Sequence, residues 1–209
     1  MKKIALLFFL QLTLMNVFSQ TNLPFAVEIA PNGFEAKFIL KQDISTGNVI
    51  ISVDTNGNIE ISTLGESAIK YHWIETMVSG KIERIDDVKF EYYYDSNNPG
   101  KIKKIGNLLF TYYAYDEHES KVGKIKSIGN YTFNYYDFMA EKGKTGRISQ
   151  IGNVKIGYFH GLENSGKVSQ IGNIRISYNT DFDNNINSGK ITDIIGNQEG
   201  VLIKTSFNN

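Results

Sequence analysis

The stretch GKIKSIGNYTFNYY, residues 123–136, decides the fold, because close copies of it recur along the chain. Aligned on the glycine before a basic residue, the copies start at Gly80, Gly100, Gly123, Gly146, Gly166 and Gly189, with a weaker copy at Gly57. From Gly57 onward the intervals are 23, 20, 23, 23, 20 and 23 residues. Periods of 20 or 23 residues indicate stacked supersecondary units, each of which buries its apolar face against its neighbours.

The turn chemistry predicts that each unit is a β-hairpin. In Ile128-Gly129-Asn130-Tyr131, Gly and Asn lie between two apolar positions, and a glycine in the first central position suits a two-residue type II′ turn. Side chains alternate between the two faces of a strand, so one face of each hairpin should carry the core. The predicted core residues are Ile105, Leu108, Phe110, Tyr112, Ile128, Tyr131, Phe133, Tyr135, Ile151, Val154, Ile156, Tyr158, Ile171, Ile174, Ile176 and Tyr178.

The opposite face of each hairpin should carry one aliphatic residue beside one aromatic ring. The predicted pairs are Ile82 with Tyr93, Ile102 with Tyr113, Ile125 with Tyr136, and Ile148 with Phe159. If the hairpins stack in register, these four rings form a column on the outer face, and we take them as candidate ligand-binding residues. The competing interpretation is that the rings only cover neighbouring strands.

Upstream of the regular copies, residues 34–41, 49–53, 59–62 and 69–73 also read as strands, and no stretch has a helical period. We therefore predict an all-β fold, an antiparallel meander of roughly 14 to 16 short strands. Tandem hairpins would form a twisted or coiled sheet. Residues 20–79 would supply the N-terminal strands and a degenerate repeat, and 80–209 six hairpin repeats, all in one continuous domain.

The amino terminus has the features of a cleaved signal peptide. Lys2 and Lys3 precede an apolar run over residues 4–18, and Val17-Phe18-Ser19 forms a passable cleavage site before Gln20. The run is short for a membrane-spanning helix and carries Gln11 and Asn16. We expect residues 1–19 to be removed and the mature chain, without a membrane span, to reach the periplasm, the cell surface or the medium. The chain has no cysteine, so its stability cannot come from disulfides.

Charge argues against a nucleic-acid partner. The 209 residues hold 22 basic and 22 acidic side chains, and loss of the first 19, with Lys2 and Lys3, would leave 190 residues with 20 and 22. Near neutrality gives no long-range field to attract a polyanion. Basic residues beside Tyr112, Tyr113, Tyr115, Tyr135 and Tyr136 could in principle cradle a single strand. Lys101, Lys103, Lys124 and Lys126 are more simply strand lysines that cover apolar neighbours and protect strand edges.

Searching for catalytic chemistry gives no motif for a nucleophile, a phosphate loop or a zinc site. His72, His118 and His160 have no partner at metal-ligand spacing. Residues 54–60 and 181–187 alternate oxygen-bearing side chains as calcium loops do, but Asx-rich turns explain both stretches. Asp86-Asp87 replaces Gly-Asn at a turn and is a poor pair for glycoside hydrolysis. We predict no enzyme activity, no metal and no cofactor.

Tyr-Tyr-Tyr-Asp at 92–95, followed by Gly100-Lys101-Ile102, resembles the tyrosine-aspartate repeats of Rhs-type toxin shells and teneurins. In that family, hairpins coil into a hollow shell, which six copies are too few to form. The Asp is missing after Tyr158 and Tyr178, and the Ile-Gly-Asn turn is this chain's own feature. This resemblance covers about residues 80–195. The sequence looks still more like small exported bacterial proteins with Gly-Lys-Ile, Ile-Gly and late-Tyr repeats, a group to which the resemblance attaches no activity.

Two functions follow as expectations. The first is an exported structural or protein-interaction module whose partner is an unknown protein or a surface polysaccharide. The second is a glycan-binding module that uses Tyr93, Tyr113, Tyr136 and Phe159, because sugar faces stack on exposed rings held by a rigid sheet. Exposure of these rings separates the two.

Overall fold

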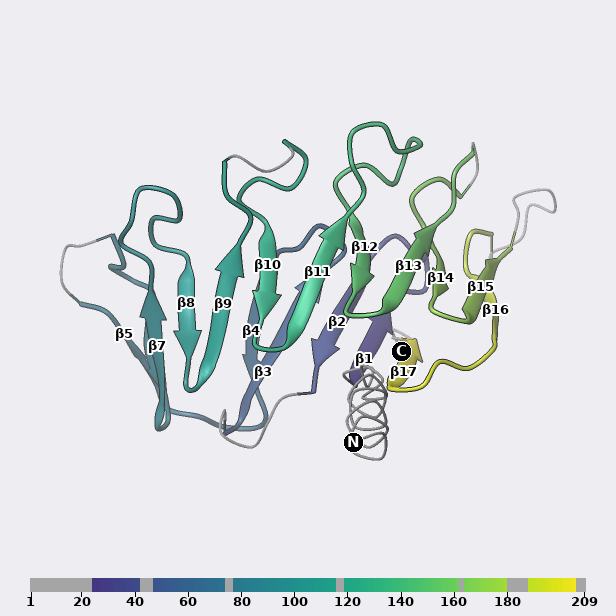
Figure 1. The fold of residues 1–209 in the computed structure, drawn as a ribbon. Helices are drawn as coiled ribbons and strands as arrows, with labels where there is room; N and C mark the ends of the chain where they lie inside the picture. The colour runs from purple at the N-terminus through teal and green to yellow at the C-terminus, as the bar shows by residue number, and fades with distance from the viewer. Residues whose placement is uncertain are drawn as a thin grey trace, which may run out of the picture.

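The computed structural model describes residues 24–41, 47–73, 77–115, 119–161, 164–179 and 188–205. These residues form 17 strands in two sheets, of 12 and 5 strands (Figure 1). The predicted all-β fold of tandem hairpins is confirmed. The expected signal peptide, His118 and the acidic stretch 181–187 lie outside the described residues. In the described part of the chain, no helix is long and apolar enough to cross a membrane.

The twelve-stranded sheet is a meander, since its strands lie side by side in the order of the chain. They are β5 (Ile69–Tyr71), β6 (Ile82–Ile85), β7 (Val88–Tyr92), β8 (Ile102–Ile105), β9 (Leu108–Tyr112), β10 (Ile125–Ile128), β11 (Tyr131–Tyr135), β12 (Ile148–Ile151), β13 (Val154–Tyr158), β14 (Val168–Ile171), β15 (Ile174–Tyr178) and β16 (Ile191–Ile195). The hairpins β6–β7, β8–β9, β10–β11, β12–β13 and β14–β15 each correspond to one sequence repeat.

The hairpin turns have the geometry that the Gly-Asn sequence predicts. The first turn residue has a positive φ, 54° at Gly129 and 49° at Asp86, which replaces the glycine in the first hairpin. Asp86 is the one residue other than glycine with positive φ in the part of the chain that the structure describes. The asparagine after each turn glycine therefore has a negative φ, as a type II′ turn requires.

A β-bulge recurs wherever one hairpin pairs with the next. Between β9 and β10, for example, the register shifts between Ile125 and Ser127, so that Lys126 is the extra residue. The bulge reverses the alternation, and Ile125, Ile148 and Val168 are fully buried in the core. The prediction that Ile125 and Ile148 lie on the outer face was wrong, because strict alternation does not allow for an inserted residue.

The five-stranded sheet has the order β17-β1-β2-β3-β4. Its strands are β1 (Phe25–Ile29), β2 (Ala36–Leu40), β3 (Val49–Asp54), β4 (Ile59–Thr63) and β17 (Val201–Thr205). Sequence analysis predicted strands near β2, β3 and β4 but not β1. It also did not predict that β17 leaves the repeats and pairs parallel to β1, since a five-residue strand carries no signal for a partner so far along the chain.

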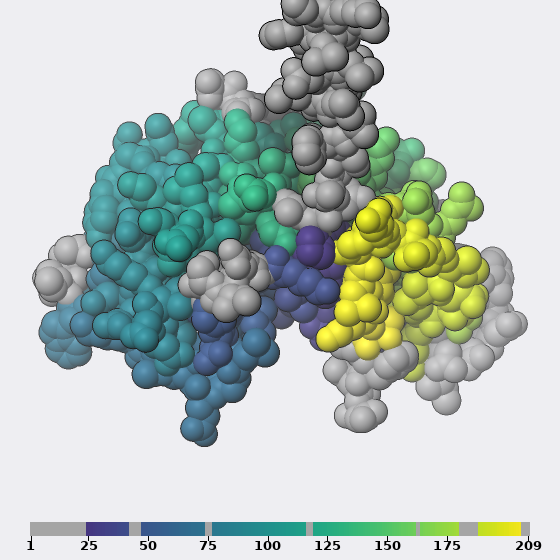
Figure 2. All heavy atoms as spheres, turned by 60° about the horizontal axis from the view of Figure 1, so that its bottom comes forward, coloured from purple at the N-terminus to yellow at the C-terminus, as the bar shows by residue number. Residues whose placement is uncertain are grey.

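The two sheets pack face to face over one apolar core (Figure 1). From below, the purple and blue residues of the small sheet lie between the teal repeats and the yellow C-terminal strands (Figure 2). Backbone bonds join the sheets, because the amide of Ile148 donates to Thr55 at 2.7 Å and that of Val168 donates to Gly33 at 3.0 Å. Gly33 has a φ of 73°, and a Cβ there would lie 2.2 Å from the Tyr178 ring. Only glycine therefore fits at position 33, where the two sheets are in contact.

Candidate functional site

The five hairpin turns lie at one end of the strands of the large sheet, and the longer segments that link successive hairpins lie at the other end (Figure 1). We call these segments, residues 72–81, 93–101, 113–124, 136–147 and 159–167, the connections. Two strands separate one connection from the next, so their bases are about 10 Å apart. The repeat therefore presents comparable loops at regular intervals on a fixed scaffold.

The four predicted site residues, Tyr93, Tyr113, Tyr136 and Phe159, each begin a connection and pack on the following hairpin. We call them the late rings. Each contacts a tyrosine of that hairpin edge to face, at centroid distances of 6.1 Å (Tyr93–Tyr112), 6.0 Å (Tyr113–Tyr135), 6.1 Å (Tyr136–Tyr158) and 5.8 Å (Phe159–Tyr178). Tyr113 is buried, with 7% of its surface exposed, and the other three are half-buried.

The hydroxyl groups of the late rings are also engaged. Tyr93 donates to the carbonyl of Phe110 at 2.9 Å, and Tyr136 donates to that of Ile156 at 2.9 Å. The Tyr113 hydroxyl lies 2.7 Å from the carbonyl oxygen of Phe133. Phe159 occupies the same place without a hydroxyl. The four residues thus lie in successive repeats, and each one connects its own repeat to the next by a packing contact.

A second set of tyrosines closes each hairpin from within. These core tyrosines are Tyr92, Tyr112, Tyr135, Tyr158 and Tyr178, and their hydroxyls donate to the carbonyls of Ile82, Ile102, Ile125, Ile148 and Val168 at 2.7 to 3.0 Å. Each bond joins the far ends of the two strands of one hairpin. Burial raises the pKa of Tyr92 to about 12 and that of Tyr135 further, because an ionised phenol would lose its hydration there.

A ladder of basic side chains runs along the bases of the connections. This basic ladder consists of Lys81, Lys101, Lys124, Arg147 and Lys167, which donate to the carbonyls of Gly100, Gly123, Gly146, Gly166 and Gly189. Each cation also lies over the core tyrosine of its own hairpin, as Lys101 does 4.7 Å from the Tyr112 centroid. Burial lowers the pKa of Lys101 and of Lys124.

Sequence analysis treated Lys101 and Lys124 as lysines that cover strands, and so missed the ladder. The available signal was that every copy places a basic residue directly after its first glycine. Only the structure shows why, since each glycine carbonyl accepts the bond from the preceding repeat. The ladder and the late rings together hold both ends of the four connections from 93–101 to 159–167, and in the first connection His72 takes the place of the late ring by packing on Tyr92.

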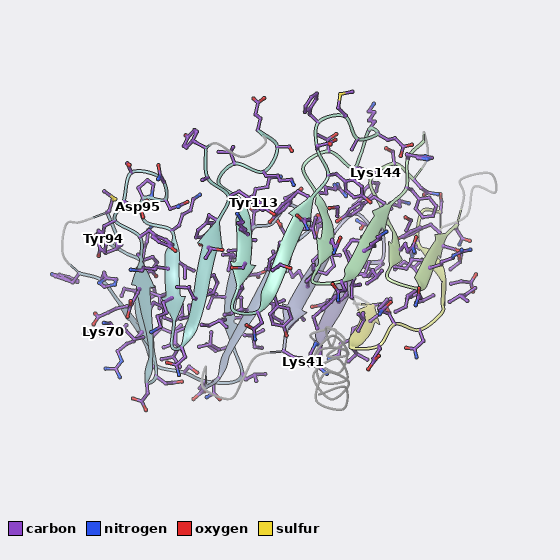
Figure 3. The ribbon with its side chains drawn as sticks, in the orientation of Figure 1. Lys41, Lys70, Tyr94, Asp95, Tyr113 and Lys144 are labelled. Carbon is purple, nitrogen blue, oxygen red and sulfur yellow. The ribbon has the colours of Figure 1, made fainter. Side chains whose placement is uncertain are left out.

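One or two residues after its start, each of the first four connections carries an exposed aromatic side chain. Trp73 is 95% exposed and Tyr115 is 81% exposed, and Tyr94 and Phe138 are also largely exposed. We call Trp73, Tyr94, Tyr115 and Phe138 the aromatic row, because they come from four consecutive connections at the same end of the strands. Figure 3 labels Tyr94 in this region, beside Asp95. Sequence analysis did not single out this row, since nothing in the alternation distinguishes an exposed ring from a buried one.

A groove of about 480 Å³ lies between the base of the connections and the small sheet. Asn56, Gly57 and Ile59 line it on one side, and Lys101, Tyr112 and Lys124 on the other. Both lysines already donate to the ladder carbonyls. The groove therefore offers aromatic and amide groups more readily than free charge.

The remaining candidates for chemistry have structural contacts. Asp54 accepts hydrogen bonds from the amides of Asn56 and Asn58, both at 2.8 Å, so its carboxylate caps an Asx-rich turn. His72 packs on Tyr92 at 5.9 Å, and His160 lies 3.3 Å from Glu141 at the surface. Within the described ranges, no group of three or more acidic or histidine side chains could hold a metal ion.

The site therefore combines an aromatic row with a rigid base formed by the late rings and the basic ladder. Comparison with protein-family models, curated proteins and solved structures finds no match to this chain, so its function is argued from this geometry.

Proposed function

We propose that this chain is an exported structural or protein-interaction module and that its partner binds the aromatic row. The observation that carries the proposal is the exposure of one large aromatic side chain in each of four consecutive connections. Aromatic residues are enriched in protein interfaces, and tryptophan and tyrosine contribute disproportionately to binding. A linear set of four such residues offers an extended contact surface.

The scaffold beneath the row supports this role. Four of the five connections start with a late ring and end with a residue of the basic ladder. The first connection starts with His72, which packs on Tyr92, and ends with Lys81. The bases of the connections are thus ordered before binding, which lowers the conformational entropy lost when a partner docks. Recognition by variable loops on a repeated rigid framework is a common arrangement for binding proteins.

A glycan is the second candidate partner. Exposed rings on connections whose bases are about 10 Å apart could stack on the sugar faces of an extended polysaccharide, and the groove beside Tyr112 and Asn56 adds amide groups. The four residues that the sequence predicts as a sugar platform, Tyr93, Tyr113, Tyr136 and Phe159, pack edge to face with tyrosines of the next hairpin, and their three hydroxyls contact carbonyls. The aromatic row is therefore the better surface for a sugar as well.

A pull-down with matched variants tests the proposal. The mature chain is immobilised and exposed to cell-surface proteins and, separately, to polysaccharide extracts. A row variant (Tyr94→Ser, Tyr115→Ser, Phe138→Ser) should lose the captured partner, and the extract that yields it decides between protein and glycan. A control variant (Leu109→Ser, Leu202→Ser) removes exposed apolar residues elsewhere and should retain the partner. Equal capture by both variants would overturn the assignment to the aromatic row.

A further inference from the structure

The twelve-stranded sheet begins and ends with half a hairpin. Its first strand, β5, pairs with β6 across a connection and has the register shift that marks contacts between successive hairpins. Its last strand, β16, pairs with β15 in the same way. The strand that would complete the hairpin of β16 is β17, but β17 pairs with β1 in the other sheet. The array of hairpins thus starts with β5, which has the position of the second strand of a hairpin, and ends with β16, which has the position of the first strand of a hairpin.

At the β5 end, two core positions are open to solvent. Comparison of the registers shows that Ile69 occupies the position equivalent to Phe90 of the next hairpin, and Tyr71 the position equivalent to the core tyrosine Tyr92. Ile69 is 44% exposed where Phe90 is 2% exposed, and Tyr71 is 53% exposed where Tyr92 is 8% exposed. Both side chains have the residue type of core positions, and in the described part of the chain no strand pairs with the other side of β5.

The β16 end has the matching feature. Ile194 pairs with Ile176, as Ile171 pairs with Ile156 one repeat earlier. Ile194 is 40% exposed, whereas Ile171 is fully buried. Repeat arrays usually end in a unit with a polar outer face, and exposed edge strands are usually protected by charge or distortion. Here both ends keep apolar core positions.

We propose that β16 of one copy pairs antiparallel with β5 of a second copy and completes the missing hairpin. Within the chain, β5 pairs with β6 and β16 pairs with β15 through the side that a strand uses to contact a different hairpin. The opposite side of β5 and of β16, which in the other strands pairs within a hairpin, lies at the edge of the sheet. The two free sides are therefore those that face each other within every internal hairpin, such as β8 and β9. This inference rests on the proposed structural role but uses a different surface from the aromatic row.

The basic ladder would continue through the same junction. Lys190 follows Gly189 as Lys167 follows Gly166, and so occupies the next ladder position. In the other repeats this residue lies over the core tyrosine of its own hairpin and donates to the next glycine carbonyl. Across the junction the equivalent groups are Tyr71 and Gly80 of the second copy. The Tyr71 hydroxyl would correspondingly reach the carbonyl of Ile191, as Tyr178 reaches Val168 at 2.7 Å.

Such an interface joins two different surfaces, so it can repeat from copy to copy. Interfaces of this kind produce rings when the rotation closes and open filaments when it does not. Assembly by pairing of identical edges, β5 with β5 or β16 with β16, would instead stop at a dimer. The two possibilities predict different behaviour for variants blocked at one end.

Sedimentation of end-blocked variants tests the proposal. The mature wild-type chain should form species larger than a dimer as its concentration rises. Tyr71→Lys and Ile194→Lys each block one end, and each variant alone should be a monomer. An equimolar mixture should form a one-to-one dimer, because each variant supplies the intact end that the other lacks. Leu109→Lys, at an exposed aliphatic residue in the middle of the array, should assemble like the wild type.

Cysteine cross-linking tests the register in the cysteine-free chain. By analogy with the pair Arg84 and Lys89 of the first hairpin, Asp193 should lie opposite Ala68 of the second copy. Cα atoms of directly opposed residues in antiparallel strands are about 4.5–5.5 Å apart, close enough for a disulfide. A mixture of Ala68→Cys and Asp193→Cys chains should therefore oxidise to the heterodimer in preference to either homodimer.

Three results would overturn the inference. These are a wild-type chain that stays monomeric up to its solubility limit, a blocked variant that still dimerises alone, or a mixture that remains monomeric while both variants keep the wild-type circular dichroism spectrum. None of these results affects partner capture by the aromatic row. Conversely, loss of capture without loss of assembly would refute only the binding role.

Discussion

The substitution Phe159→Tyr should stabilise the protein, and it tests the structural role of the late rings. In three repeats the late ring is a tyrosine whose hydroxyl bonds to a carbonyl of the next hairpin, namely Phe110, Phe133 or Ile156. Phe159 packs on Tyr178 at 5.8 Å, with nearly the same geometry as Tyr136 on Tyr158 at 6.1 Å. A hydroxyl added to Phe159 should therefore reach the equivalent carbonyl, that of Ile176.

The magnitude follows from one hydrogen bond between neutral groups. A typical bond of this kind contributes about 0.5–1.5 kcal/mol to stability. For a protein of this size, 1 kcal/mol corresponds to a shift of about 2–4 °C in the midpoint of thermal unfolding. Phe159→Tyr should then raise Tm by roughly 1–6 °C. Tyr136→Phe, which removes the same bond one repeat earlier, should lower Tm by a similar amount, and the double variant should unfold near the wild-type temperature.

The assay is thermal unfolding followed by circular dichroism, supported by urea titration of the four proteins. The experiment should use the Ile194→Lys background, so that assembly does not alter the midpoints. An unchanged or lower Tm for Phe159→Tyr, together with the expected loss for Tyr136→Phe, would refute the equivalence of the repeats. No loss for Tyr136→Phe would refute the structural role of the late-ring hydroxyls.

Other predictions follow from the same contacts. Tyr113→Ala should cost about 3–5 kcal/mol in urea unfolding, as truncation of a buried ring does, whereas Tyr115→Ala at an exposed position should cost less than about 0.5 kcal/mol; equal effects would contradict the assignment of the two rings. Lys124→Met should cost about 1.5–3 kcal/mol by loss of the bond to Gly146, and a neutral result would show that the basic ladder contributes little. Alkaline pH should unfold the chain, because the pKa of Tyr92 rises from 10.0 in the unfolded state to about 12 in the fold. The folded state then binds more protons than the unfolded state, so this contribution is complete below pH 10 and is lost as pH rises towards 12; the last part of the tyrosine absorbance change should accompany the loss of the circular dichroism signal, and ionisation of every tyrosine with the fold intact would contradict the burial. Mass spectrometry of the exported chain should find Gln20 as its first residue, and an intact amino terminus would refute cleavage.

The hairpin array could be predicted from the sequence because its determinants are local. The Gly-Asn turn, the alternation around it and the 20- or 23-residue period all lie within one repeat, and residues such as Phe133 and Ile151 are buried as expected. The bulge at Lys126 could not be predicted, because an inserted residue changes the facing of Ile125 without changing the pattern of residue types. Pairing of β1 with β17 depends on packing between segments about 170 residues apart, which no local signal encodes.

The candidate site was harder to predict because exposure depends on neighbouring repeats. Tyr93 and Tyr94 are adjacent tyrosines in the sequence, yet one packs on Tyr112 and the other faces solvent. The alternation left two interpretations of the late rings open, a ligand platform or a cover for neighbouring strands, and each ring packs on a tyrosine of the next hairpin. Which aromatic side chain of a connection is exposed became apparent only when the exposed fraction of each ring was known from the structure.

Fluorescence of Trp73 tests the central claim, that partners bind the aromatic row, most directly. Trp73 is the single tryptophan of the chain and is 95% exposed at one end of the row. The measurement is collisional quenching of its emission in the Ile194→Lys chain, with and without the partner recovered by pull-down. When the partner binds, the emission should shift to shorter wavelength and Trp73 should become protected from the quencher. Binding that leaves Trp73 fully accessible to the quencher would contradict it.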